Sequence, residues 1–390
     1  MLRQSNKYRK KFKYCLAEYL NINQESIHFF WKGRVALYAI LKGLGVKNGD
    51  KVILPAFTCI AAINPIIYLG AEPVYVDIDP RTYTIDYKKI EKKIDSQVRA
   101  ILAQNTYGLA PDLDEILKLK DKYDIAVIED CAHGFGGYYK GKLNGTVADA
   151  SFYSCQWNKP FSTGLGGIAI TNMPALMNNL KHYEETFRTP TLKDMFFLKV
   201  LISIREKIPT SGYWVSIKTY RWLSKHNIVL GSSQKEELEG VTKPANFEKG
   251  YSEFQAKIGL RELKKFPAAL EKRLKTANSY KDILNGLKKS TPYEPDYAIH
   301  TFLKFPILVK NKEKFFSLAE RAGIEIGDWF LSPIHPSLKD FERWHYNWGA
   351  NPIGEKISRH VVNLPTHKKT KVSSICEIEN FLKQNEGMIF

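Results

Sequence analysis

A lysine and an aspartate, Lys159 and Asp130, stand in settings that could together hold an aldehyde cofactor. Lys159 follows a short apolar run and precedes the glycine-rich turn STGLGG, after which a second strand is expected. Asp130 ends the apolar run IAVIED. A lysine amine can bond an aldehyde as a Schiff base, and a carboxylate can keep a pyridine nitrogen protonated. The pair therefore predicts a pyridoxal phosphate (PLP) enzyme with Lys159 as its catalytic residue.

A predicted helix start could supply the phosphate anchor of such a cofactor. Gly33, Arg34 and Val35 open a helical pattern after the run IHFFW. A helix N-terminus presents free N–H groups and is a ready site for phosphate. Gly33 taken alone is also compatible with an ordinary turn, so this assignment depends on the other site residues.

Two further side chains, Ser154 and His133, lie close in sequence to the lysine and the aspartate. Ser154 is five residues before Lys159 and could add a hydroxyl to the phosphate site. His133, three residues after Asp130, either hydrogen-bonds the cofactor or fills a loop. Asp130 itself could instead be a helix N-cap or a loop acid. Its neighbour Glu129 should point the other way, because side chains alternate along a strand.

These residues are embedded in alternating apolar runs and helical patterns, which predict an α/β fold. We expect strands at 52–55, 73–79, 100–104 and 125–130. We expect helices at 35–44, 60–69, 87–94 and 113–123. Strands separated by helices of this length imply parallel βαβ units, and their apolar runs fit a mostly parallel sheet covered by helices on both faces. Asp130 would then lie at the carboxyl end of its strand, where open α/β sheets bind ligands.

The two ends of the chain predict further elements and a division into two domains. Residues 7–20 form a basic amphipathic helical pattern, and a long helix begins near Ser252, in which Pro267 predicts a kink or a break. A smaller C-terminal α+β domain follows, with strands at 302–309 and 360–365 and helices at 312–322 and 373–384. We expect a large domain over 1–245, and a linking helix with the small domain over 246–390.

A helical insertion near 190–230 interrupts this pattern. Its two helical stretches, 195–207 and 213–225, are apolar, aromatic and basic. They could pack on the body as a hairpin, form a subunit interface, or contact a membrane surface through residues 191–226. Packing in the core or in an interface is the simpler interpretation.

Composition restricts the class of protein. The formal net charge of +17 would suit nucleic acid, an anionic substrate or an anionic membrane, but the sequence has no nucleic-acid-binding motif and its lysines are spread along the chain. No apolar run has the length of a transmembrane helix, and the basic N-terminus lacks the apolar core of a signal peptide. The five scattered cysteines lack metal-ligand spacing, so we expect a reduced, cytoplasmic protein without a metal site.

The chain resembles the DegT-type sugar aminotransferases of PLP fold-type I. The specific motifs are VIEDCAH at 127–133 and the segment from Ser154 through Lys159 to its glycine turn. Supporting segments lie at 33–59, 70–86, 252–266 and 361–367. The resemblance implies transfer of an amino group from an amino acid, glutamate or glutamine, to a keto-sugar linked to a nucleotide, as in polysaccharide biosynthesis. It also implies a homodimer whose active sites are shared between subunits.

The same resemblance implies a role for each candidate residue. Lys159 matches the lysine that bonds the cofactor aldehyde and later shuttles protons, and Asp130 matches the acid that pairs with the pyridine nitrogen. His133 matches a position near the phenolic oxygen of the ring. Ser154 and the backbone of residues 33–35 match the phosphate site.

Several positions depart from the family pattern. Cys59 stands where an aromatic residue often stacks on the cofactor ring, and Leu165 stands in the glycine turn where glutamate is usual. Glu248 occupies the position of a phosphate-binding asparagine that reaches in from the partner subunit, with Asn246 nearby. A glutamate would repel phosphate, so either Asn246 takes this role or the contact is absent. These departures leave the substrate open.

Two other functions are compatible with this fold. PLP-dependent sugar dehydratases commonly carry histidine in place of the lysine, so Lys159 argues against that activity. A non-catalytic regulator or scaffold could use residues 191–226 for docking, but the presence of both Asp130 and Lys159 argues against a loss of chemistry. A PLP-dependent aminotransferase is the function that we expect.

Overall fold

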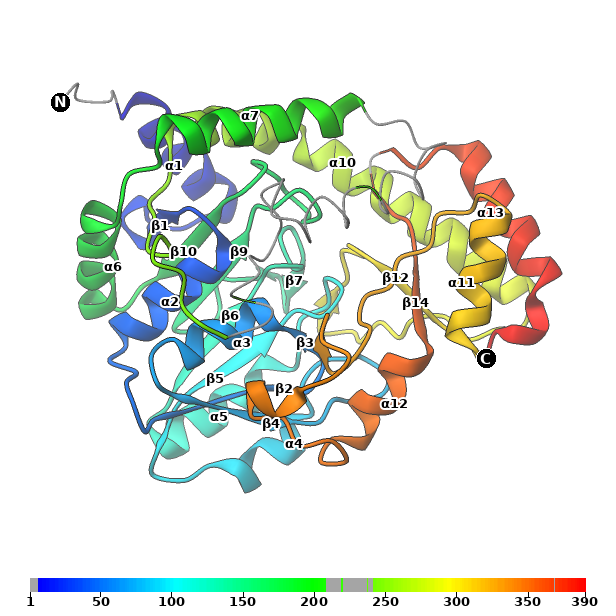
Figure 1. Cartoon of the computed structure of the whole chain (residues 1–390), viewed down its shortest axis with the longest axis horizontal. Coiled ribbons are helices and arrows are strands. Elements are labelled where there is room, and N and C mark those ends of the chain that lie inside the picture. Colours follow the sequence, from blue (N-terminus) through cyan, green and yellow to red (C-terminus); the bar gives the residue numbers. More distant parts are fainter. Residues whose placement is uncertain (1–5, 208–218, 220–236, 238–240, 368) are drawn as a thin grey trace.

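The computed structural model describes residues 6–207, 219, 237, 241–367 and 369–390. Within these residues a seven-stranded sheet lies at the centre of the molecule, in the order β1-β10-β9-β6-β5-β2-β4 (Figure 1). Its strands are β1 (Ile27–Phe30), β2 (Lys51–Pro55), β4 (Glu72–Val76), β5 (Val98–Gln104), β6 (Ala126–Asp130), β9 (Ala150–Ser154) and β10 (Gly167–Thr171). Neighbouring strands from β4 through β9 are parallel, whereas β10 is antiparallel to both of its neighbours. The prediction of a mostly parallel sheet is therefore confirmed.

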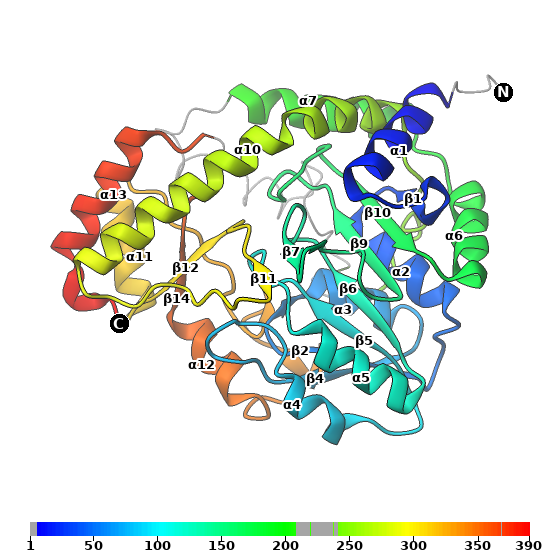
Figure 2. The ribbon, with the colours of Figure 1, turned by 180° about the vertical axis from the view of Figure 1, so that it is seen from behind.

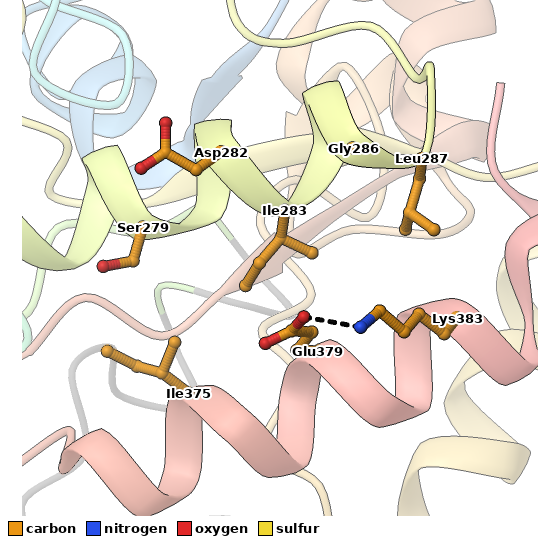
Figure 3. Close-up of a pocket in the computed structure, with 8 residues that line it drawn as sticks. All are labelled: Ser279, Asp282, Ile283, Gly286, Leu287, Ile375, Glu379 and Lys383. Carbon is orange, nitrogen blue, oxygen red and sulfur yellow. Dashed lines mark hydrogen bonds and ion pairs between the residues drawn. The ribbon is translucent and has the colours of Figure 1, made fainter.

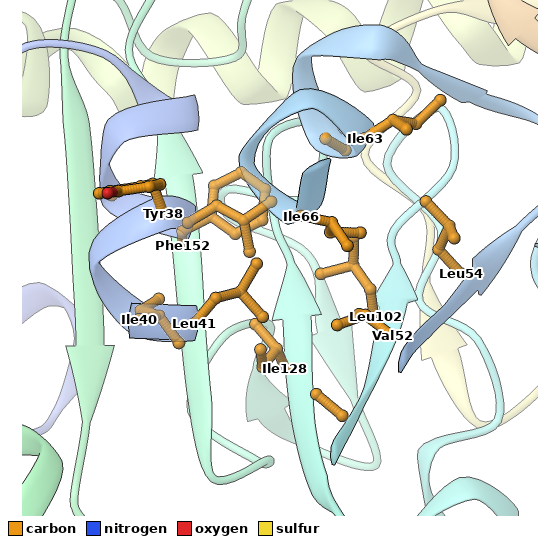
Figure 4. Close-up of a cluster of buried hydrophobic side chains, with 14 of the residues drawn as sticks. Tyr38, Ile40, Leu41, Val52, Leu54, Ile63, Ile66, Leu102, Ile128 and Phe152 are labelled. Carbon is orange, nitrogen blue, oxygen red and sulfur yellow. The ribbon is translucent and has the colours of Figure 1, made fainter. Parts of the chain in front are cut away.

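One face of the sheet is covered by α2 (Gly33–Gly43), α3 (Ile60–Ile67) and α6 (Pro174–Thr186). Figure 4 shows Leu41 and Ile66 from the helices beside Leu102, Ile128 and Phe152 from the strands. Burying a large apolar side chain contributes about 1.5–3 kcal/mol relative to leaving it exposed. This layer therefore fixes α2, whose first turn lies at the candidate site.

The opposite face is covered by two groups of helices. α4 (Tyr87–Ile90) and α5 (Leu113–Tyr123) pack on β2, β5 and β6, whereas α1 (Lys7–Leu20) and α10 (Glu253–Gly286) pack on β1, β9 and β10 (Figure 2). Successive strand residues such as Ile101 and Leu102 belong to clusters on opposite faces, as strand alternation requires. The predicted helical cover of both faces is confirmed.

The long helix α10 runs through Pro267 without interruption, so of the kink or break predicted at this residue the break is wrong. Ser252 and Gln255 form a capping box at its start, which satisfies N–H groups that the first turn leaves unpaired. Phe266, before the proline, packs in the cluster shared with α1, and Tyr280, beyond it, packs in a C-terminal cluster. Packing on both sides holds the helix together although proline removes one backbone hydrogen bond.

A separate hydrophobic cluster lies in the C-terminal part of the chain. It joins the end of α10 to α11 (Lys312–Arg321), α13 (Val372–Gln384) and the antiparallel pair β12 (Phe305–Leu308) and β14 (Val361–Leu364). β12 is shorter than the strand predicted at 302–309, because Phe302 has a positive φ of 47° and the N–H groups of Thr301 and Leu303 donate to a distant loop. Residues 334–346, in contrast, contribute Ile334 and Trp344 to the cluster around α2 and α3.

The first helical stretch of the insertion forms α7 (Leu192–Lys207), which packs on the body. Leu198 is fully buried with Trp31 and Leu165, so α7 covers the glycine turn that follows Lys159. The second predicted stretch, 213–225, falls almost entirely outside the described residues. None of the helices in the described ranges combines the length and apolarity needed to cross a bilayer.

Short elements complete the described part of the chain. They are β3 (Thr58–Cys59), β7 (Tyr138–Tyr139), β8 (Lys142–Leu143), β11 (Ala298–Ile299), β13 (Ile334–His335), α12 (Pro352–His360) and the 3-10 turns Gln24–Ser26, Glu91–Lys93, Phe341–Trp344 and Glu386–Met388. β3 pairs in parallel with β13, which places Cys59 beside His335. This pairing brings a C-terminal segment to the edge of the central sheet.

The carboxyl ends of β5, β6 and β9 meet at one edge of this sheet. Gln104 is paired with Asp130 across β5 and β6, and Ser154 with Gly167 across β9 and β10. A Cβ atom on Gly167 would lie 2.2 Å from the carbonyl oxygen of Lys32. Only glycine permits this close approach, and through it the start of α2 lies at the same edge as Asp130 and Ser154.

Candidate active site

Lys159 and Asp130 come together at the carboxyl edge of the sheet. Asp130 is the last residue of β6 and is 5% exposed. Lys159 is half-buried in the loop after β9, where its backbone N–H donates to the carbonyl oxygen of Gln156 at 3.0 Å. Each of the two side chains shifts the pKa of the other, so the structure places the predicted amine and carboxylate in one electrostatic environment.

The amine of Lys159 is prepared to lose its proton. Desolvation lowers the pKa of Lys159 to about 8, from an ordinary value of 10.5. The Cys59 thiol and the Asp130 carboxylate act in the opposite direction, whereas the positive charges of Lys304 and Arg34 lower the pKa further. A neutral amine is the form that can attack an aldehyde carbon, so the surroundings favour the nucleophilic state.

Asp130 and Glu129 are adjacent but serve different parts of the fold. The Glu129 carboxylate accepts backbone N–H groups of Gly145, Val147 and Ala148 at 2.8–3.1 Å. It therefore points away from Lys159, as strand alternation predicted. Burial raises the pKa of Asp130 to about 6, although one of its oxygens accepts the Ala132 N–H at 2.9 Å. At neutral pH Asp130 is a buried anion suited to a buried cationic partner.

His133 is buried beside this pair and is kept neutral. Burial lowers its pKa well below 6.5, and the positive charges of Lys159 and Lys304 act in the same direction. Its Nδ1 accepts the backbone N–H of Tyr107 at 3.3 Å. An accepting Nδ1 in a neutral imidazole leaves the proton on Nε2, so Nε2 is available as a hydrogen-bond donor.

Gly33 and Ser154 touch at the start of α2. A Cβ atom on Gly33 would lie 2.7 Å from Cβ and 3.1 Å from Oγ of Ser154. Glycine therefore lets the first turn of the helix reach the serine hydroxyl, as the predicted phosphate site requires. The backbone N–H of Val35 donates to the carbonyl oxygen of Lys32 at 3.0 Å, so this N–H is engaged within the helix turn.

Arg34 brings a buried cation to the same place. Its guanidinium Nη1 donates to the Glu237 carboxylate at 2.5 Å, and both side chains are almost fully buried. The main-chain carbonyl of Glu237 accepts the side-chain amide of Asn64 at 3.0 Å. The positive charge of Arg34 also lowers the pKa of Lys159. The side chain of Arg34 therefore acts on the site, in addition to the backbone contribution that the sequence predicted.

Cys59 lies close enough to the reactive lysine to act on its charge. It is half-buried at the end of β3, and its thiol raises the pKa of Lys159. The nearby Phe57 is fully buried and packs edge-to-face against Phe330 at 4.9 Å and Tyr107 at 6.1 Å. Phe57 is thus part of a buried aromatic cluster against which Cys59 and Trp329 also pack.

Glu248 is held on the surface of its own chain. Its carboxylate accepts hydrogen bonds from the Tyr38 hydroxyl and the Lys243 ammonium, each at 2.9 Å. Asn246 is exposed two residues earlier. The sequence predicted that the negative charge of Glu248 would lie near the phosphate bound by a partner subunit. Here that charge is paired with the Lys243 ammonium of the same chain.

The sequence interpretation missed Trp329 and Lys304, which come from the C-terminal part of the chain. The Nζ atoms of Lys159 and Lys304 lie 4.7 and 5.3 Å from the centroid of the Trp329 ring. The same ring stacks on His133 at 5.1 Å. Both residues occur in segments without a recognisable motif, so only the tertiary fold reveals them.

A surface hollow between α10 and α13 has no part in this site. Figure 3 shows Ser279 and Asp282 from α10 above Ile375, with the Glu379–Lys383 ion pair of 2.7 Å along α13. The hollow shares no residue with the group around Lys159. We therefore place the chemistry at the carboxyl edge of the sheet.

Comparison with known proteins identifies the family. Residues 2–202 and 217–383 match the DegT/DnrJ/EryC1/StrS aminotransferase family. The chain belongs to this family. It is accordingly a PLP-dependent sugar aminotransferase, and the prediction of the family, the fold-type I architecture and the cofactor is confirmed.

Three relatives illustrate the range of the family. The chain is 27% identical to GDP-perosamine synthase of Escherichia coli O157:H7 over 89% of this chain and 83% of the relative. It is 28% identical to UDP-2-acetamido-2-deoxy-3-oxo-D-glucuronate aminotransferase of Pseudomonas aeruginosa over 88% and 81%. It is 35% identical to L-glutamine:2-deoxy-scyllo-inosose aminotransferase of Streptoalloteichus tenebrarius over 38% and 35%.

Solved structures share the fold over nearly the whole chain. An aminotransferase from Psychrobacter cryohalolentis has a TM-score of 0.76 at 20% identity, covering 99% of this chain and 92% of the other. A putative sugar aminotransferase from Streptococcus pneumoniae, solved in its PLP form, has a TM-score of 0.75 at 19% identity, covering 97% and 91%.

The side chains of this aminotransferase fit PLP. Asp130 offers a buried anion for the protonated pyridine nitrogen, and Nε2 of His133 offers a donor for the phenolic oxygen. Gly33 and Ser154 leave room at the helix N-terminus for phosphate. Lys159 supplies an amine with a lowered pKa for the aldehyde.

Proposed function

We propose that this aminotransferase moves an amino group from glutamate or glutamine to a keto-sugar linked to a nucleotide. The observation that carries the chemistry is the placement of Lys159 and Asp130 at the carboxyl edge of the sheet, where Asp130 is buried at the end of β6 and Lys159 lies in the loop after β9. The acceptor class is supported by relatives whose names state GDP- and UDP-linked sugars, and the donor by a relative named for glutamine.

Lys159 acts first as the covalent anchor and then as the proton carrier. Its neutral amine would hold the aldehyde of PLP as an imine, with loss of the aldehyde oxygen as water, until a donor amine took its place. When bound, PLP would supply an electron-poor ring that withdraws electrons from the carbon bearing the amino group. The Lys159 amine, once free, would be the base that takes a proton from the donor carbon and the acid that returns it, and it would serve the keto-sugar in the reverse order.

Asp130 and His133 hold the ring in its reactive state. Asp130, ionised above a pH of about 6, keeps the pyridine nitrogen protonated and so strengthens electron withdrawal. His133 would donate from Nε2 to the phenolic oxygen, because its Nδ1 accepts the Tyr107 N–H. Both side chains are buried, so each would meet the cofactor in surroundings with little water.

A second copy of the chain is the partner that we propose. The family resemblance implies a homodimer with active sites shared between subunits, and Asn246 is exposed. Sedimentation equilibrium should give the mass of two chains. A monomer that aminates its acceptor at full rate would contradict the shared site.

The proposal is tested with purified, PLP-loaded protein. The protein is incubated with glutamate or glutamine and a panel of nucleotide-linked keto-sugars, and the products are identified by mass spectrometry. We expect an amino sugar with the wild type, none with Lys159→Ala, and a wild-type yield with Lys264→Ala, an exposed lysine of α10. Product formation by Lys159→Ala, or failure of every acceptor in the panel, would contradict the proposal.

A further inference from the structure

Trp329 forms a wall beside the reactive amine. Its backbone is held from both sides, because its N–H donates to the Asn363 side chain at 2.9 Å and its carbonyl oxygen accepts the Tyr107 hydroxyl at 2.6 Å. The indole ring stacks on His133 with an interplanar angle of 18° and lies 4.7 Å from Nζ of Lys159. Trp329 is only partly buried, so part of this wall is accessible to solvent.

Lys304 adds a second ammonium group to this wall. It precedes β12, is half-buried, and places Nζ 5.3 Å from the Trp329 ring centroid. Its charge acts on both Lys159 and His133, lowering the pKa of each. Lys304 therefore faces the active site, although none of the tasks of holding PLP requires it.

An aromatic face next to an ammonium suits one class of ligand. A pyranose ring presents a face of C–H groups that packs on an aromatic ring, whereas phosphate oxygens pair with a lysine ammonium. A molecule that reacts at Lys159 and extends toward solvent would run along Trp329 and pass Lys304. An amino-acid donor has no ring to cover the indole, whereas a nucleotide-linked sugar has both a pyranose and a diphosphate.

We propose that Trp329 and Lys304 form the acceptor subsite, in which the indole supports the keto-sugar ring and the Lys304 ammonium pairs with the diphosphate. The proposal rests on the proposed function, because it specifies how that acceptor is recognised. Both residues touch the acceptor and neither is required for the donor. They are specificity residues and take no part in proton transfer.

The first test measures binding without turnover. UDP-glucose and GDP-mannose serve as probes, and their affinity for the PLP-loaded protein is measured by calorimetry. We expect Lys304→Met to weaken binding by roughly 10–100-fold, the usual effect of losing a hydrogen bond to a charged group. Lys304→Arg should retain most of the affinity. The matched control is Lys310→Met, an exposed lysine just beyond the other end of β12, which should bind like the wild type.

The second test separates the two half-reactions. Trp329→Leu and Lys304→Met should raise KM for the acceptor at least ten-fold, while the rate of the donor half-reaction stays within about three-fold of wild type. Trp329→Phe, which keeps an aromatic face, should recover most of the loss. Lys304→Met should also move the pH midpoint of PLP capture upward, because the charge that lowers the pKa of Lys159 is removed.

Failure of the acceptor subsite and failure of the proposed function would give different results. If the wild type aminates a nucleotide-linked sugar but the variants keep wild-type acceptor KM and probe affinity, the subsite is wrong and the proposed function stands. An increase in donor KM alone would overturn the subsite as well, because Lys304 would then hold the donor carboxylate. If the probes bind through Lys304 but no keto-sugar is aminated, the subsite stands and the proposed reaction is wrong.

Discussion

Adjacent residues at the end of β6 show how a strand divides structural and chemical tasks. Glu129 accepts three backbone N–H groups from the 145–148 loop and so ties that loop to the sheet. Asp130 accepts one, from Ala132, and its charge acts on Lys159. Strand alternation directs the two carboxylates to opposite sides, so similar substitutions at the two positions should have different consequences.

Asp130→Asn should lower the rate of amino transfer while the protein stays folded. The amide is neutral and cannot keep the pyridine nitrogen protonated, so electron withdrawal by the ring is weakened. We expect kcat to fall on the order of 100-fold or more, the usual cost of removing a preorganised electrostatic partner. Single-turnover kinetics of the donor half-reaction, with circular dichroism to check folding, measures this effect.

Glu129→Gln is the matched comparison. Its loss of charge weakens three hydrogen bonds in the core, and we expect a loss of about 1–3 kcal/mol in the free energy of unfolding. The rate of the remaining folded protein should stay within a few-fold of wild type. The opposite pattern would be a slow Glu129→Gln variant and an active Asp130→Asn variant. It would show that Glu129, and not Asp130, pairs with the pyridine nitrogen.

The pKa of Lys159 predicts how PLP capture depends on pH. Desolvation lowers this pKa to about 8, so the neutral, reactive fraction grows as pH rises toward 8 and saturates above it. Below a pH of about 6 Asp130 also becomes protonated and loses its attraction for the pyridine nitrogen. The rate of covalent capture by cofactor-free protein is followed by absorbance. It should rise from a pH of about 6 and level off near a pH of about 9.

The control for this profile is a free lysine analogue, whose amine has an ordinary pKa near 10.4. Its reaction with PLP should continue to accelerate well above the pH at which the protein levels off. Borohydride trapping and mass spectrometry locate the bond on Lys159. A protein profile identical to that of the analogue would mean that the amine is fully solvated.

Among the elements, α7 deserves a direct test because it covers the glycine turn beside Lys159. Leu198 is fully buried against Trp31 and Leu165, whereas Phe196, two residues earlier, is 64% exposed. Leu198→Ala should lower the free energy of unfolding by about 2–4 kcal/mol and weaken PLP binding by loosening the turn. Chemical denaturation and PLP titration measure the two effects.

Phe196→Ala serves as the control for this helix. An exposed side chain contributes little to folding, so the free energy of unfolding should change by less than about 0.5 kcal/mol. If Phe196→Ala instead destabilises the protein at high concentration and not at low concentration, α7 lies in an interface between copies. Equal effects of the two substitutions at all concentrations would contradict the packing of α7 through Leu198.

Elements with a strong local pattern could be predicted from the sequence, and those that depend on distant partners could not. α1 and α5 occur at the predicted residues because their amphipathic spacing is contained in the segment itself. A break at Pro267 does not occur, because the packing that keeps α10 continuous comes from α1 and the C-terminal cluster.

The same distinction holds for the site. Lys159 and Asp130 could be found from the strands and glycines that adjoin them. Trp329 and Lys304 could not, because loops held by Asn363 and Tyr107 bring them to the active site from the far end of the chain. A sequence pattern identifies groups that share one local segment, whereas this part of the site exists only after the chain has folded.

For the whole molecule, the net charge of +17 predicts salt-dependent capture of the acceptor. A positively charged surface attracts a nucleotide diphosphate over a distance that ionic strength sets, about 30 Å at 0.01 M and 8 Å at 0.15 M. We expect kcat/KM for the nucleotide-linked acceptor to fall several-fold across this range of potassium chloride. The value for glutamine, which carries no net charge, should change much less, so the ratio of the two isolates the electrostatic part.

Lys304→Met separates this general attraction from the local ion pair of the acceptor subsite. The substitution removes one positive charge from a net seventeen, so it should lower kcat/KM for the acceptor at every salt concentration while leaving the salt dependence nearly unchanged. If the dependence disappears in this variant, the effect comes from one ion pair and the distributed lysines have no influence on the encounter. If acceptor and glutamine respond equally to salt in the wild type, charge attraction does not govern acceptor capture.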